Sequence, residues 1–108
     1  MQKNNKLYKG TLQNIILKLL AKETRMYGYQ ITQMAKELTQ GELEMTEGAL
    51  YPILHKLEQD NLIASEIRTV NGRDRKYYVL TDQGKQTQML QEEEMKSYLL
   101  NLNVIFNL

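Results

Sequence analysis

One stretch, residues 46–58, reads TEGALYPILHKLE and decides how the rest of the chain is arranged. Its large apolar residues recur at spacings of three and four, which places them along one side of a helix: Leu50, Ile53, Leu54 and Leu57. Thr46 is the predicted N-cap, because its hydroxyl can accept a hydrogen bond from a backbone N–H of the first turn. Pro52 falls in the second turn, and the apolar spacing continues through it. The side that carries Tyr51 and His55 is therefore free to meet a partner.

A β-hairpin is predicted directly after this helix. Residues 62–70 have the composition of a strand, residues 71–72 read Asn-Gly, and residues 76–80 form a second extended run. Asn-Gly between two such runs is a strong signal for a tight reversal. Alternation in the first run places Ile63 and Ile67 on one face, which we expect to pack on the helices.

Two helices are predicted before the central one. The first runs from residue 7 or 11 to residue 22, and the second covers 28–39, with Gly41 in the position of a C-terminal cap. Residues 23–26 are expected to form a short polar connection. Three helices followed by a hairpin make a mainly α fold with a small β-hairpin, in the order of a winged helix-turn-helix. In such folds the third helix enters the major groove of DNA and the hairpin touches neighbouring phosphates.

A long final helix is predicted from Asp82 onward, with Thr81 as its cap. A core of three helices and a hairpin is complete before this helix begins, so its apolar stripe needs another cover, and a second subunit is the simplest one. We therefore expect residues 1–81 to form a DNA-binding unit and residues 82–108 to be a C-terminal dimerisation helix, joined in one structural unit. The expected dimer interface consists of Met95, Tyr98, Leu99, Leu102, Ile105 and Phe106.

Composition limits the classes of function. The chain has 108 residues, no cysteine and one histidine, so a disulfide framework and a thiolate metal site are excluded. No cofactor, metal site or enzyme activity is expected, because no carboxylate pair or glycine-rich phosphate loop stands in a suitable context. The longest apolar cluster, residues 15–21, is too short to cross a membrane. A cytoplasmic setting is expected.

Charge is distributed unevenly although the formal net charge is only +1. Residues 37–60 are acidic, which counts against DNA binding by the central helix alone. Basic residues gather instead in the hairpin and near the N-terminus, so we expect most phosphate contacts there. These residues are Arg73, Arg75 and Lys76 in the hairpin and Lys3, Lys6 and Lys9 in the N-terminal arm.

Several pieces of the sequence, in this order, resemble the PadR family of bacterial transcriptional regulators: KGTL at 9–12, YGYQI at 27–31, EGALYPIL at 47–54, LE at 57–58, LI at 62–63, KYY at 76–78, and LT at 80–81 followed by Gly84. The resemblance implies a homodimeric DNA-binding repressor of the short subfamily, whose C-terminal helix pairs with the other subunit. Asn61 stands where family members usually carry a glycine or a similar residue, which predicts a left-handed backbone there. Some relatives bind planar drugs or phenolic acids near the dimer interface, although the absence of tryptophan argues against the drug-stacking version here.

The leading interpretation is a sequence-specific transcriptional regulator. It would act as a homodimeric repressor on a pseudo-palindromic operator in double-stranded DNA, and a small aromatic inducer would relieve it. The alternative is a winged-helix module for protein–protein interaction, whose acidic third helix meets a basic partner. Tyr51 also has two interpretations, as a DNA contact or as a ring packed over the start of the second helix. The expected DNA-contacting residues are Thr46, Glu47, Gly48, Ala49, Tyr51, His55, Arg73, Arg75 and Lys76.

Overall fold

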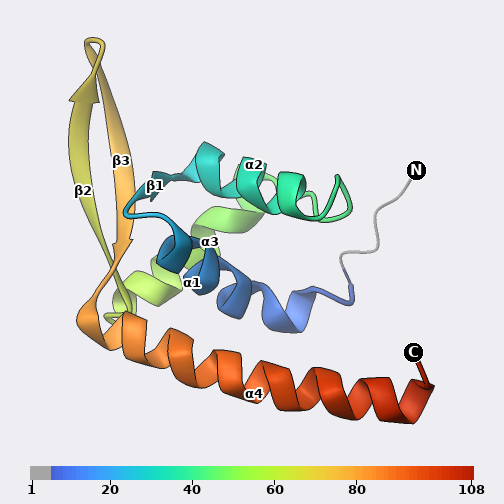
Figure 1. The fold of residues 1–108 in the computed structure, drawn as a ribbon. Helices are drawn as coiled ribbons and strands as arrows, with labels where there is room; N and C mark the ends of the chain where they lie inside the picture. Colours follow the sequence, from blue (N-terminus) through green and yellow to red (C-terminus); the bar gives the residue numbers. More distant parts are fainter. Residues whose placement is uncertain (1–5) are drawn as a thin grey trace.

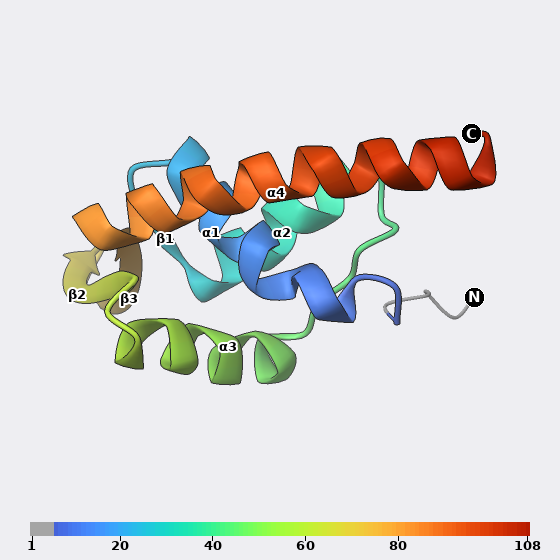
Figure 2. The same cartoon turned by 90° about the horizontal axis from the view of Figure 1, so that it is seen from below.

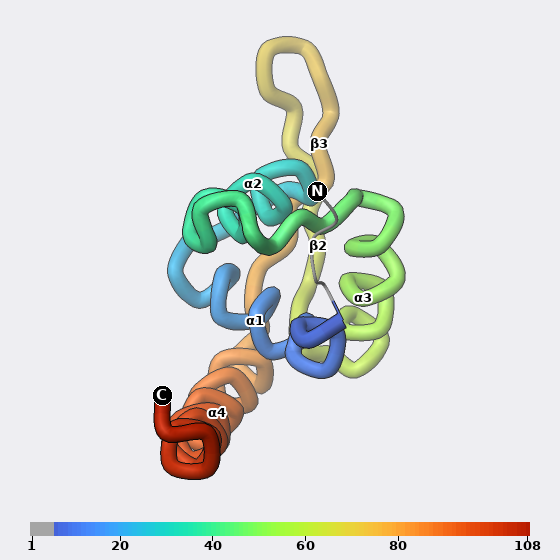
Figure 3. The backbone as a smooth tube through the Cα atoms, turned by 90° about the vertical axis from the view of Figure 1, so that its right-hand side faces the viewer, coloured from blue at the N-terminus to red at the C-terminus, as the bar shows by residue number. Residues whose placement is uncertain are grey.

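The computed structural model describes residues 6–108, and it shows a mainly helical fold with a small antiparallel sheet (Figure 1). The elements are η1 (Lys9–Thr11), α1 (Leu12–Lys22), β1 (Met26–Tyr27), α2 (Gly28–Leu38), α3 (Glu47–Gln59), β2 (Ile63–Val70), β3 (Arg73–Leu80) and α4 (Asp82–Phe106). Helix α1 lies between α3 and α4, so the outer side of α3 faces away from α4 (Figure 2). The hairpin of β2 and β3 projects beyond the helical body (Figure 3). This arrangement confirms the winged helix-turn-helix fold with a long C-terminal helix.

The core forms where α1, α2 and α3 meet the base of the hairpin. Leu50, Leu54 and Leu57 of α3 are buried, as their spacing predicts, and Ile53 is partly buried against the same cluster. They pack with a set of equally buried residues from the neighbouring elements and from the segment between α2 and α3: Ile16, Leu17, Ile31, Leu43 and Ile63. Burial of this apolar surface is the main force that holds α3 on the body and leaves its opposite side in solvent.

The sheet has a third strand, where the sequence predicts only a connection. Residues Met26 and Tyr27 form β1, which pairs antiparallel with Tyr78 and Tyr77 of β3. A strand of two residues is too short to produce an alternating pattern, so the expectation of a polar connection at 23–26 is wrong at its end. Strand β3 also begins at Arg73 rather than at Lys76. The ladder reaches the turn itself because Asn71 and Gly72 both adopt positive φ, at 54° and 74°.

The hairpin packs on α1–α3 at its base, and its turn end projects beyond them (Figure 1). Ile63, at its base, is buried, but Ile67 is 63% exposed. The expectation that both pack on the helices is therefore wrong for Ile67. This residue lies further along β2 than Ile63, towards the turn, and the turn end of the hairpin extends beyond the helices (Figure 1).

The predicted ends of the helices are found, with one difference. The hydroxyl of Thr46 accepts from the N–H of Ala49 at 3.1 Å, and Asn61 adopts the expected left-handed conformation at φ 62°. At the end of α2, Gln40 and Gly41 both have positive φ, and the N–H of Gly41 donates to the carbonyl of Lys36 at 2.7 Å. Gly41 thus takes part in the cap, but Gln40 occupies the first left-handed position.

Helix α4 is fixed to the body at its start and along its first half. The hydroxyl of Thr81 accepts from the N–H of Gly84 at 2.9 Å. Further along, the ammonium of Lys18 in α1 lies 2.6 Å from Glu92 Oε1. Hydrogen bonds from Lys18 and Gln88 lower the pKa of the Glu92 carboxyl. Within residues 6–108, no helix is both long and apolar enough to cross a membrane.

Candidate nucleic-acid interface

The outer side of α3 is a continuous solvent-exposed surface. Glu47, Gly48, Tyr51, Pro52 and His55 are all exposed, and the buried leucines lie on the opposite side. Thr46 and Ala49 are also exposed, at the start of the helix. All six residues that the sequence assigns to the groove are therefore exposed on the N-cap and the first three turns of one helix.

Gly48 leaves the start of α3 flat. A Cβ built at this position would meet only Thr46 Oγ1, at 3.8 Å. The backbone of the first turn, with its free N–H groups, can therefore approach another backbone closely.

Tyr51 connects α3 to the start of α2. Its hydroxyl donates to Glu47 Oε1 at 3.2 Å, and a Cβ at Gly28 would stand 2.7 Å from that hydroxyl. Burial and the Glu47 carboxylate raise the pKa of Tyr51. The ring thus packs over the start of α2, as one of the two interpretations predicts, while 45% of the residue stays exposed.

His55 is exposed one turn after Tyr51. Its Nε2 lies 3.3 Å from Gln59 Nε2, so the ring is in contact with an amide of its own helix. Among the described residues, no group of three His, Cys, Asp or Glu side chains could hold a metal ion.

The basic residues of the hairpin do not form one patch, because side chains alternate along a strand. Arg73 and Arg75 lie on one face of β3, and Lys76 lies on the other. The guanidinium of Arg75 is 4.3 Å above the ring centre of Tyr27, and the ammonium of Lys76 is 5.6 Å above that of Tyr78. Arg73 directly follows the turn and is exposed, whereas Arg75 is partly buried against Tyr27 of β1.

A further basic residue, Arg68 of β2, lies on the same face of the hairpin as Arg73 and Arg75, which we call the arginine face. It pairs with Arg75 across the ladder, so the two side chains share that face. Glu66 lies between Arg68 and Arg25, at 3.2 Å and 2.9 Å from their Nε atoms. The cross-strand register is the signal that reveals Arg68, and this register follows from the Asn-Gly turn.

The N-terminal arm lies beside the start of α3. Lys6 and Lys9 line a surface hollow of about 460 Å³ together with Thr46 and Ala49. Two of the arm's lysines thus stand next to the exposed first turn. Lys3 is outside the described residues.

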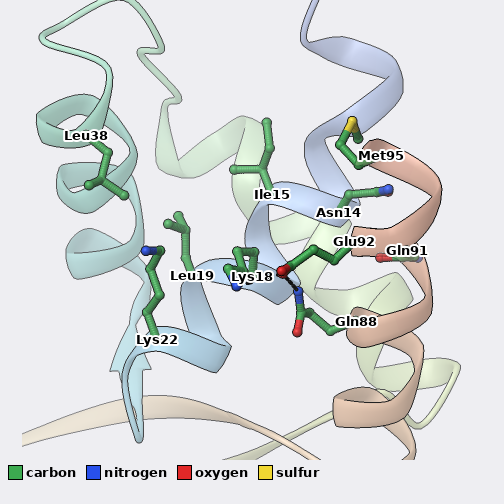
Figure 4. Close-up of a pocket in the computed structure, with 10 residues that line it drawn as sticks. All are labelled: Asn14, Ile15, Lys18, Leu19, Lys22, Leu38, Gln88, Gln91, Glu92 and Met95. Atoms are coloured by element: carbon green, nitrogen blue, oxygen red, sulfur yellow. Dashed lines mark hydrogen bonds and ion pairs between the residues drawn. The ribbon is translucent and has the colours of Figure 1, made fainter. Parts of the chain in front are cut away.

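The second half of α4 has exposed apolar side chains on more than one side. Tyr98, Leu99, Ile105 and Phe106 of the predicted interface are exposed, and Met95 and Leu102 are partly buried. The sequence pattern did not single out Leu100 and Val104 on the other side, which are also exposed. Between α1 and α4 lies an apolar hollow of about 250 Å³, with Ile15, Leu19, Leu38 and Met95 in its wall (Figure 4).

The fold combines a body of three helices, one of which has an exposed side, with a two-stranded wing (β2 and β3) that carries arginines. This combination defines a winged-helix protein of the DNA-binding class. The chain belongs to the transcriptional regulator PadR-like family, whose model matches residues 16–92. The family resemblance seen in the sequence is thereby confirmed. Members of this family are transcriptional regulators that bind DNA, so the chain is a regulator rather than an enzyme.

This chain is also similar to individual transcriptional regulators. A PadR family transcription regulator from hypervirulent Clostridium difficile R20291 is 30% identical, with a TM-score of 0.72 over 90% of this chain and 98% of that one. A transcriptional regulator from Clostridium thermocellum is 26% identical, with a TM-score of 0.80 over 91% and 95%. The transcriptional regulator Rv3488 of Mycobacterium tuberculosis is 40% identical over 65 residues, which are 60% of this chain and 58% of that relative.

Proposed function

We propose that this protein is a cytoplasmic homodimeric repressor of transcription that binds a pseudo-palindromic operator in double-stranded DNA. Residues 1–81 form the DNA-binding unit and residues 82–108 the dimerisation helix. The observation that carries the proposal is the exposed side of α3, which combines a flat first turn at Gly48 with side chains that can reach base edges. The groove residues are Thr46, Glu47, Gly48, Ala49, Tyr51 and His55, and the phosphate ligands are Arg73, Arg75 and Lys76.

The distribution of charge supports this division of roles. Phosphate contacts supply affinity and fix the position of the protein, whereas base contacts supply specificity. The acidic Glu47 stands on the exposed side of α3, while arginines stand on the wing and Lys6 and Lys9 beside the first turn. The cations can therefore hold the backbone while the helix meets the groove between them.

A small aromatic inducer is the remaining part of the proposal. The apolar hollow between α1 and α4 supports a small compound, since its volume of about 250 Å³ lies just below the usual range of small-molecule pockets, roughly 300–1,000 Å³. An inducer seated there, or at Tyr98, Leu102 and Phe106, would alter how α4 pairs and so change the spacing of the two α3 helices.

Selection from a random pool of duplex DNA, followed by gel shift at two salt concentrations, tests the function. We expect one enriched sequence with two-fold symmetry, and an affinity that falls by about 10³-fold or more between 50 and 200 mM salt, because several phosphates are neutralised. A module for protein–protein interaction would enrich no sequence and would show no such salt dependence. That result would refute the proposed function.

The wing can be tested by replacing Arg73, Arg75 and Lys76 with Ala together. We expect weaker binding to every DNA sequence by a similar factor, and a salt slope reduced by about 0.9 for each phosphate that the variant no longer neutralises. An unchanged slope would contradict the role of the wing and would leave Lys6 and Lys9 as the main phosphate ligands.

The two faces of β3 offer a matched comparison within this experiment. Arg73→Ala and Lys76→Ala each remove one exposed charge, from opposite faces of the same strand. If all three cations contact phosphates, as proposed, both variants weaken binding. An effect in Arg73→Ala alone would show that only the face of Arg73 and Arg75 meets DNA, and it would remove Lys76 from the proposed phosphate ligands. Lys96→Ala, on α4, removes a charge far from the wing and serves as the control.

A further inference from the structure

We propose that Glu47 reads a cytosine in the operator and that Tyr51 is the residue that positions its carboxylate. This inference rests on the proposed function and assigns chemistry to two of its groove residues. The observations behind it are the hydrogen bond from the Tyr51 hydroxyl to Glu47 Oε1 and the contact of the same ring with Gly28.

The position of Glu47 needs a reason, because a carboxylate near DNA is repelled by phosphates. Glu47 is the first residue of α3 and is exposed on its outer side. The N-terminal end of the helix dipole favours a carboxylate in the first turn of α3, and the repulsion from DNA is offset where this carboxylate accepts a hydrogen bond from a base edge in the major groove. Exposed amino groups there belong to cytosine N4 and adenine N6, but adenine presents its N7 acceptor beside N6. A carboxylate is repelled by that acceptor, so cytosine is the base it favours.

Tyr51 fixes one oxygen of this carboxylate and leaves the other available. The hydroxyl lies 3.2 Å from Oε1, one helical turn along α3. A tyrosine hydroxyl is protonated at neutral pH, and burial and the Glu47 carboxylate raise its pKa further, so it donates to the carboxylate. Oε2 keeps its capacity to accept a hydrogen bond from a base. A side chain that is oriented before binding loses less conformational freedom on binding, which favours the correct base.

Gly28 holds the tyrosine in place. A Cβ at this position would stand 2.7 Å from the hydroxyl oxygen and 3.1 Å from Cζ, so the ring occupies the space that a side chain at position 28 would fill. The ring of Tyr51 thus packs directly on Gly28, which is the first residue of α2 and is buried. The direction of the Glu47 carboxylate is therefore set by two helices and not by α3 alone.

The experiment uses the full chain, the selected operator and duplexes in which each C·G pair is replaced in turn. We expect Glu47→Gln to lose about tenfold or more of its preference for cytosine at one position in each half-site. Tyr51→Phe removes only the hydroxyl, and we expect it to lose part of the same preference at the same position, by about threefold to tenfold. The double variant should be no worse than Glu47→Gln, because the hydroxyl acts through the carboxylate.

Tyr29→Phe is the matched control, since it removes a hydroxyl from an exposed tyrosine of α2 that lies one residue after Gly28. It should keep the preferences of the parent protein. If Tyr51→Phe and Glu47→Gln also keep them, the inference is wrong while the DNA-binding function stands. Equal weakening on every duplex would overturn it too, because that result indicates a phosphate contact. Failure of the parent protein to enrich any DNA would reject both proposals before a variant is made.

Discussion

Gly84→Ala is expected to destabilise the protein severely, lowering the free energy of unfolding by about 3 kcal/mol or more. A Cβ at this position would clash with the backbone carbonyl oxygen of Leu62, and it would also approach Leu80 Cδ2 at 3.3 Å. Backbone cannot move aside as the end of a flexible side chain can. The substitution therefore forces α4 away from the chain that leaves α3.

The junction that would be disturbed ties three elements together. The N–H of Thr81 donates to the carbonyl of Leu62 at 3.1 Å, and the N–H of Leu62 donates to that of Leu57 at 3.0 Å. The Thr81 hydroxyl donates to the carbonyl of Asn61 at 2.8 Å. Moving α4 away from Leu62 would thus disturb the start of α4, the end of β3 and the turn after α3 at once.

Thermal unfolding measures this effect, and Gly48→Ala is its control. Gly48 is also in the first turn of a helix, but a Cβ there meets nothing closer than 3.8 Å. Higher helix propensity should leave that variant equal to the parent or up to about 1 kcal/mol more stable. Gly84→Ala should melt about 10 °C or more below the parent, if it folds at all. Equal melting temperatures for the two variants would show that α4 does not need its close approach to Leu62.

Features that depend on local sequence were predictable. The spacing of Leu50, Leu54 and Leu57 identifies the buried side of α3, and a hydroxyl at Thr46 or Thr81 marks the start of a helix. Asn71 and Gly72 locate the turn of the hairpin. Each of these signals acts over a few residues, so a single sequence displays them directly.

Features that depend on distant partners were not predictable. Strand β1 exists because β3 offers Tyr77 and Tyr78 to pair with, and no pattern within two residues can show this. The exposure of Ile67 depends on how far the hairpin extends beyond the helices. The contact of Tyr51 with Gly28 also joins residues of different helices, and for this reason the sequence offers it only as one of two interpretations of Tyr51. The separation of the hairpin cations onto two faces was not predictable either. Lys76 lies on the opposite face from Arg73 and Arg75 because β3 begins at Arg73, so that all three residues alternate within one strand.

The dimer proposal predicts different results for the two sides of α4. Leu102 and Phe106 are one turn apart on the side that continues from Met95, which packs towards α1. Leu100 and Val104 are also one turn apart, but two residues along a helix correspond to about 200° of rotation, so they lie on the far side. Both pairs contain large apolar residues, and Leu100 and Val104 are 63% and 74% exposed. Replacing either pair with Glu adds the same two charges to the same part of the helix.

We expect Leu102→Glu with Phe106→Glu to give a monomer in sedimentation at micromolar concentration, and Leu100→Glu with Val104→Glu to remain a dimer. A dimer holds its two α3 helices at about 34 Å, one turn of DNA, so that both half-sites are bound together. Once the first half-site is occupied, the second binding step is intramolecular, and its absence should reduce operator affinity by about 10²- to 10⁴-fold. A single half-site should be bound equally by the parent and by the monomeric variant, because α1 separates α3 from α4 (Figure 2).

If the Leu100 and Val104 variant is the one that dissociates, the interface lies on the opposite side of α4 from the predicted stripe. If both variants remain dimers and keep operator affinity, residues 82–108 do not form the dimer contact, and the apolar side chains of α4 must have another partner.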